Sequence, residues 1–128
     1  MRYLLDTHTA MWYMGNTPNP LPFNTKEIIS NNENYIYLSS VSLWEIAIKV
    51  NLGKLTLSLT FDEFLNRITN SDFNILQIEN EYLKKLADLP FLHKDPFDRL
   101  LISTAIVENL IIITADESIH KYDVSCIF

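Results

Sequence analysis

The sequence predicts a three-layer α/β/α sandwich with a mostly parallel central sheet. Segments typical of strands alternate with segments typical of helices along the chain, and this alternation favours parallel strands covered by helices on both faces. The segment 110–114 is an unbroken apolar run, which is typical of a central strand buried on both faces. Because 128 residues suit a single core, we expect one domain that spans residues 1–128.

The first quarter of the chain predicts one strand and two helices. Residues 2–5 are short and apolar and predict a strand that ends at Asp6. Residues 9–14 contain Ala, Met and aromatic side chains that favour a helix. Three of the five prolines lie in 16–22 and predict a loop, and a polar helix at about 25–32 is expected to face water.

The next elements are a strand and two helices. Residues 35–39 are aromatic and β-branched and predict the second strand. The apolar segment 42–49 predicts a helix, and Gly53 ends it. Thr60 opens a further helix over 60–69, in which apolar residues recur at helical spacing.

The last part of the chain completes the alternation. Residues 73–78 predict a third strand, and 81–89 a short amphipathic helix. A longer helix over 96–108 begins at a proline and ends at Asn109. Residues 124–128 predict a final strand at or near an edge of the sheet.

Composition excludes several classes of protein. Ten Lys and Arg against 16 Asp and Glu give a net charge of −6, so nucleic acid cannot be held by bulk charge and any contact must be local. No apolar segment approaches the roughly 20 residues of a membrane span, and the N-terminus lacks the apolar run of a secretory signal. Cys126 is the only cysteine, which excludes an internal disulfide and favours the cytoplasm.

Four acidic residues lie where parallel sheets carry their sites, at the carboxyl ends of strands. Asp6 follows the first predicted strand, and Asp116 lies just past the apolar run 110–114. Glu45 falls in the first turn of the helix after the second strand. Asp98 falls in the first turn of the helix over 96–108.

Each acid taken alone also has a structural explanation. Asp6 and Asp116 suit helix caps, and Glu45 completes a capping box with Ser42. Asp98 complements the helix dipole after a cap at Asp95.

Taken together, the four acids favour a metal site. Carboxylates that converge on one pocket repel one another, and a divalent cation removes the conflict. Oxygen ligands suit Mg²⁺ or Mn²⁺, and such ions support hydrolysis of a phosphodiester by metal-activated water.

Four segments closely resemble those of the PIN-domain nucleases, and in particular the VapC-type toxins of bacterial toxin–antitoxin pairs. The segments are Asp6-Thr7-His8, 42–49 with Leu52-Gly53-Lys54-Leu55, 93–101 (His-Lys-Asp-Pro-Phe-Asp-Arg-Leu-Leu) and Thr114-Ala115-Asp116. The resemblance runs from Arg2 to Val124.

The resemblance implies a metal-dependent endoribonuclease that acts on RNA with Mg²⁺ or Mn²⁺. Asp6, Glu45, Asp98 and Asp116 match the acidic quartet of the family one for one. It also implies a small cognate antitoxin protein as partner, and we expect a homodimer.

Other marked residues have structural explanations. Thr7 and Thr114 suit local capping and are left out of the predicted site. The three histidines form no ligand spacing, so structural or exposed positions are expected for His8, His93 and His120. Core positions are expected for Trp12 and Trp44, and Lys49 is an i+4 partner of Glu45. Contacts of Lys49, Lys94 and Arg99 with phosphates stay unassigned.

The alternative is a non-catalytic or degenerate PIN-like module that only binds a small partner protein. In that case the acids are caps, and metal dependence separates the two hypotheses. Haloacid-dehalogenase-like and receiver domains also place Asp after the first strand, but the residues at 8 (His) and 79 (Glu) do not match their further requirements.

Overall fold

The computed structural model describes residues 1–128 and contains a five-stranded sheet in the order β3-β2-β1-β4-β5. All neighbouring strands are parallel, which confirms the predicted α/β class. The apolar run forms an interior strand as predicted, although β1 holds the middle position and β5 lies at an edge. The strands are β1 (Arg2–Leu5), β2 (Tyr35–Ser39), β3 (Asn74–Leu76), β4 (Ile111–Ile113) and β5 (Cys126–Ile127).

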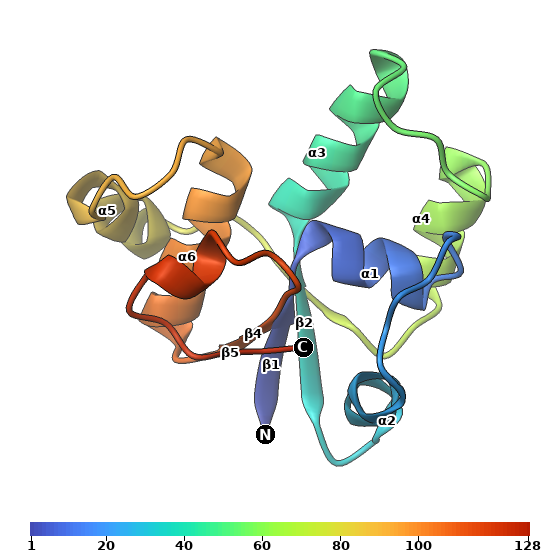
Figure 1. Cartoon of the computed structure of the whole chain (residues 1–128), viewed down its shortest axis with the longest axis horizontal. Helices are drawn as coiled ribbons and strands as arrows, with labels where there is room; N and C mark the ends of the chain where they lie inside the picture. Colours follow the sequence, from blue (N-terminus) through green and yellow to red (C-terminus); the bar gives the residue numbers. More distant parts are fainter.

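Helices cover both faces of the sheet and complete the three layers (Figure 1). Figure 1 shows α5 and α6 on one side of the strands and α1, α2 and α4 on the other. Their bounds are α1 (Thr7–Tyr13), α2 (Phe23–Ser30), α3 (Ser40–Asn51), α4 (Phe61–Thr69), α5 (Asn80–Asp88), α6 (Pro96–Glu108) and the 3₁₀ helix η1 (Ile119–Lys121). None of these helices is long and apolar enough to cross a membrane.

The strands divide their apolar side chains between two cores, because successive residues of a strand point to opposite faces. In β1, Leu5 packs with Met11 of α1 and Phe64 of α4. Leu4, its neighbour, packs on the other face with Leu101 of α6. All five side chains are almost completely buried. The two cores fix the sheet between its helix layers and hold the strand ends in place.

Several helix ends agree with the sequence prediction. Thr60 caps α4 by accepting a hydrogen bond from the Glu63 amide, and Asp95 caps α6 in the same way through the Asp98 amide. Asn109 ends α6 with a left-handed conformation, φ 55°. Gly53 follows α3 with φ +69°, a conformation that glycine adopts at little cost.

The start of α3 differs from the prediction. Ser39 is the N-cap, and its hydroxyl accepts from the Val41 amide, so the helix begins at Ser40. Glu45 is therefore the sixth residue of the helix and lies beyond the first turn. The capping box between Ser42 and Glu45 is wrong, because a capping box needs its acid at the third helical position.

One prediction about burial holds in part and one is wrong. The helix expected to face water, α2, exposes five of its eight residues but buries Thr25 and Ile29, and Ile29 packs in the core with Leu5 and Leu38. Trp44, expected in the core, is 59% exposed, because α3 turns Ile46 toward the sheet instead. Trp12 is half-buried beside Phe128.

Candidate active site

The four acids predicted from the sequence lie at the end of the sheet where the strands have their carboxyl ends. Asp6 directly follows β1, and Asp116 comes three residues after β4. Glu45 lies on α3, which starts directly after β2, and Figure 1 shows α1 and α3 starting at the same end of the strands. Asp98 is the third residue of α6.

Asp6 is both a helix cap and a link between two strands. Its Oδ1 accepts a hydrogen bond of 2.8 Å from the Thr9 amide, as the capping explanation predicts. Its Oδ2 accepts a hydrogen bond of 2.5 Å from the hydroxyl of Thr114, at the end of β4. The side chain is buried, and burial raises the pKa of Asp6, while the bonds from Thr114 and Thr9 oppose this.

Glu45 is a buried carboxylate with a partner on each oxygen. Thr7 donates a 2.6 Å hydrogen bond to Oε1, and the ammonium of Lys49 lies 2.6 Å from Oε2. The hydroxyl oxygens of Thr7 and Ser42 are 3.0 Å apart. The hydrogen bond to Glu45 raises the pKa of Lys49. The i+4 pairing of Lys49 with Glu45 is confirmed, and it supplies the positive charge that a buried carboxylate requires.

Asp98 shows that the acids act on one another. Burial, foremost, and the negative charges of four neighbouring carboxylates together raise the pKa of Asp98 to about 8. These carboxylates belong to Asp95, Asp116, Glu45 and Asp6. All four predicted acids therefore share one electrostatic environment, which we call the acidic cluster (Asp6, Glu45, Asp98 and Asp116).

Asp116 is the exposed member of the acidic cluster. Its Oδ1 accepts a hydrogen bond from the Ser118 amide, and its own amide donates to the hydroxyl of Thr114. Thr114 therefore connects Asp6 with Asp116. Thr7 and Thr114 were left out of the predicted site, but each contacts one of its carboxylates directly.

His93 and Tyr122 were also missed by sequence reasoning. Nε2 of His93 lies 3.5 Å from Oδ2 of Asp98, and Nδ1 lies 3.0 Å from the hydroxyl of Tyr122. The sequence contained only a weak signal, a histidine five residues before Asp98. It could not show Tyr122, which comes from 29 residues further along the chain.

The donor set of the acidic cluster suits a hard divalent cation, since it offers carboxylate oxygens and no sulfur. Asp98 resists ionisation because of burial and its neighbours, and a cation would relieve that cost. In this structure no three His, Cys, Asp or Glu side chains are arranged so that they could hold one metal ion. The oxygens of Asp6 and Glu45 are instead engaged by hydroxyls, an amide and Lys49.

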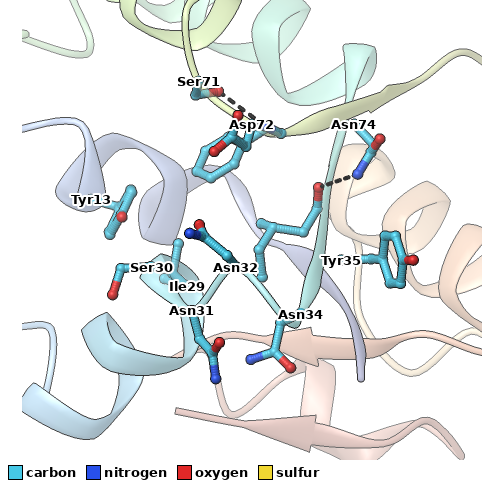
Figure 2. A pocket seen from close by; sticks show the side chains of 12 residues that line it. Tyr13, Ile29, Ser30, Asn31, Asn32, Asn34, Tyr35, Ser71, Asp72 and Asn74 are labelled. Carbon is cyan, nitrogen blue, oxygen red and sulfur yellow. Dashed lines mark hydrogen bonds between the residues drawn. The ribbon is translucent and has the colours of Figure 1, made fainter.

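Two pockets lie at opposite ends of the sheet. An open groove of about 620 Å³ borders the acidic cluster at Thr114 and Ala115. A second pocket of about 550 Å³ lies near the start of β2 and is lined by amide and aromatic side chains, including Asn32 and Tyr13 (Figure 2). None of the four acids lines either pocket, but the first pocket is lined by Ala115 and Glu117, the two sequence neighbours of Asp116, and therefore lies closer to the acidic cluster.

Several solved structures share this fold. VapBC2 from Rickettsia felis, bound to a DNA fragment from its promoter, matches with a TM-score of 0.74 and 21% identity, over 99% of this chain and 98% of that one. FitAcB from Neisseria gonorrhoeae matches with a TM-score of 0.68 and 21% identity, over 98% of this chain and 96% of that one. A toxin–antitoxin complex from Klebsiella pneumoniae matches with a TM-score of 0.63 and 18% identity, over 98% of this chain and 96% of that one.

A search of curated proteins finds no match. The family model of the PIN domain matches residues 3–125, which include all four acids and both threonines that contact them. The chain therefore belongs to the PIN domain family.

Proposed function

We propose that this protein is a Mg²⁺- or Mn²⁺-dependent endoribonuclease that hydrolyses RNA phosphodiester bonds and acts as the toxin of a toxin–antitoxin pair. The observation that carries the proposal is the electrostatic coupling of Asp98 to Asp6, Glu45 and Asp116. Four acids used only as caps have no reason to share one site. Membership of the PIN family supports nuclease chemistry.

In this proposal the four carboxylates of the acidic cluster would hold the metal, which would supply activation of water and charge stabilisation for phosphodiester hydrolysis. The surrounding residues prepare the carboxylates. Thr7 and Thr114 hold Glu45 and Asp6 by hydrogen bonds, and such partners orient metal ligands. Lys49 balances the charge of Glu45, and its side chain is 34% exposed, so it can also approach a phosphate.

The proposal includes a small antitoxin partner, for which the surface beside the site offers an apolar patch. Trp44 is 59% exposed, and its ring lies edge-on to Phe97 with centroids 5.4 Å apart. Each ring is adjacent in sequence to an acid of the cluster, Glu45 or Asp98. Exposed aromatic side chains are typical of protein interfaces, so a partner bound here would also restrict access to the acids.

The proposal also includes the expectations from the sequence about domain organisation, oligomeric state and location. We propose a single PIN-like domain over residues 1–128, a homodimer, and action in the cytoplasm, where RNA and an antitoxin are available. One of the solved structures with the same fold is a toxin–antitoxin complex from Klebsiella pneumoniae. This likeness supports a protein partner for this chain.

The test is cleavage of RNA by purified protein with Mg²⁺, Mn²⁺ or EDTA. We expect cleavage with either ion, none in EDTA, and loss of cleavage in the Asp98→Asn variant. The Asp88→Asn variant is the matched control, because Asp88 is an exposed acid at the end of α5. Full cleavage in EDTA, or by the Asp98→Asn variant, would contradict the metal mechanism, whereas no cleavage by the wild type with either ion would favour the binding module.

A further inference from the structure

The hydroxyl of Tyr122 is surrounded by nitrogen atoms. The backbone amides of Leu92 and His93 lie 3.1 and 3.2 Å from it, and Nη1 of Arg99 lies 2.9 Å away. The fourth contact, at 3.0 Å, is Nδ1 of His93. Tyr122 is 5% exposed, so water contributes little to this arrangement.

The directions of these hydrogen bonds follow from the donors. The two amides and the guanidinium can only donate, so these three donors share the two lone pairs of the Tyr122 hydroxyl oxygen. Its own hydrogen must then go elsewhere, and Nδ1 of His93 is the remaining contact. We therefore assign Nδ1 as an acceptor. The ring is neutral, and its proton is on Nε2.

This tautomer directs an N–H group at the acidic cluster. Nε2 of His93 is buried and has no hydrogen-bond partner, which is a costly state for a donor. Oδ2 of Asp98 lies 3.5 Å away, slightly beyond hydrogen-bond distance. A small movement of the Asp98 carboxylate toward His93 would satisfy the donor and leave Oδ1 free.

Arg99 holds the segment that carries His93. Its guanidinium donates to the carbonyl oxygen of Pro90 at 2.9 Å and lies over the ring of Phe91, 4.9 Å from the centroid. Together with the bond to Tyr122, these contacts fasten the loop between α5 and α6 to the first turn of α6. The backbone of the His93 segment is therefore held close to the first turn of α6, which carries Asp98.

We propose that His93 is a positioning residue for Asp98: Tyr122 fixes the His93 tautomer, and the Nε2–H group orients Oδ2 and so would hold the Asp98 carboxylate for metal binding. This inference rests on the proposed function, because it takes Asp98 to be a metal ligand. Partners of this kind typically change metal affinity about 10- to 100-fold.

The first test reads the tautomer directly, by nitrogen NMR of the histidine rings in metal-free protein at neutral pH. We expect an unprotonated Nδ1 and a protonated Nε2 in His93, with His8 and His120 as internal controls. The Tyr122→Phe variant should lose this preference, provided that thermal melting shows it folded. A proton on Nδ1 in the wild type, or an unchanged ring in folded Tyr122→Phe, would overturn the proposal.

The second test compares two replacements of His93 that place an amide differently. The amide nitrogen of Gln reaches the position of Nε2, whereas that of Asn reaches only the position of Nδ1. We expect the His93→Asn variant to bind Mn²⁺ about tenfold more weakly or worse, and the His93→Gln variant to stay within about threefold of wild type. Equal losses in both variants would indicate a packing role and overturn the proposal, as would no loss in either.

The two proposals fail in distinguishable ways. Correct tautomer and Mn²⁺ results in a protein that cuts no RNA would contradict the nuclease and leave the positioning role supported. Metal-dependent RNA cleavage by a protein whose His93 proton is on Nδ1 would support the nuclease and contradict the positioning role. A wild type that binds no Mn²⁺ would overturn the positioning role.

Discussion

Thr7 donates a hydrogen bond of 2.6 Å to Oε1 of Glu45, across 38 residues of sequence. The bond ties the first residue of α1 to the middle of α3 and joins the ends of two neighbouring strands, β1 and β2. It also gives a buried carboxylate a second partner beside Lys49. Glu45 is therefore held by tertiary contacts and not by the start of its own helix.

Removing the Thr7 hydroxyl is expected to destabilise the protein. Thr7→Val keeps the shape of the side chain but leaves Oε1 of Glu45 without its donor, so we expect a loss of about 1–3 kcal/mol in the free energy of unfolding. Urea unfolding in EDTA measures it. Thr7→Ser keeps the hydroxyl and is the control, and equal stability of the two variants would show that the bond is unimportant.

The position of the α3 cap makes a second prediction. Ser39→Ala should cost about 1 kcal/mol, because the Ser39 hydroxyl caps the Val41 amide. RNA cleavage should continue, since Ser39 contacts none of the four acids. Thermal melting with a parallel cleavage assay checks both points. Loss of cleavage in a folded Ser39→Ala protein would mean that the cap also shapes the site.

Stability of the metal-free protein should depend on pH through Asp98. The unfolded chain releases this proton near the ordinary pKa of 3.8, whereas the folded protein holds it up to about 8. Between these values the folded state binds more protons, so the free energy of unfolding falls as pH rises, and this contribution levels off above about pH 8.

The Asp98→Asn variant isolates this contribution, because Asn does not titrate. Unfolding in EDTA at about pH 5 and about pH 9 should show a smaller fall in stability for the variant than for the wild type. Added Mn²⁺ should stabilise the wild type more at the higher pH, where less work is needed to ionise Asp98. The same fall in both proteins would contradict the raised pKa of Asp98.

Replacement of the exposed Trp44 should weaken the effect of the partner without changing the fold. Expression of the wild-type protein is expected to slow bacterial growth, and a small protein from the adjacent reading frame to relieve it. Trp44→Ala should melt near wild type and still slow growth, but escape relief by the partner, because it removes the exposed ring of the patch. Full relief of the Trp44→Ala variant would place the partner elsewhere.

The sequence was sufficient to place the four acids at one end of the sheet, because strand ends are visible as short apolar segments. Glu45 was placed there because it was assigned to the first turn of its helix, but it lies beyond that turn. Ser39, Ser40 and Ser42 can each cap a helix, and only the folded structure shows that Ser39 caps the Val41 amide while Ser42 lies against Thr7. The local sequence does not show which of several neighbouring serines caps the helix.

The groups that hold the acids could not be predicted, because they come from distant segments. Thr114 reaches Asp6 across 108 residues, and Tyr122 reaches His93 across 29. The exposure of Trp44 also depends on which face of α3 meets the sheet. Such features are decided by packing, and no short segment records them.

Binding of Mn²⁺ to metal-free protein tests the metal site itself. The measurement is the dissociation constant of Mn²⁺, by calorimetry or by paramagnetic resonance of the free ion. Four variants, Asp6→Asn, Glu45→Gln, Asp98→Asn and Asp116→Asn, are compared with wild type and with the Asp88→Asn control. We predict that the wild type and the control bind alike and that each of the four folded variants binds about tenfold more weakly or worse. Wild-type affinity in all four variants, or no binding by the wild type, would contradict a metal site in the acidic cluster and return the four acids to structural roles.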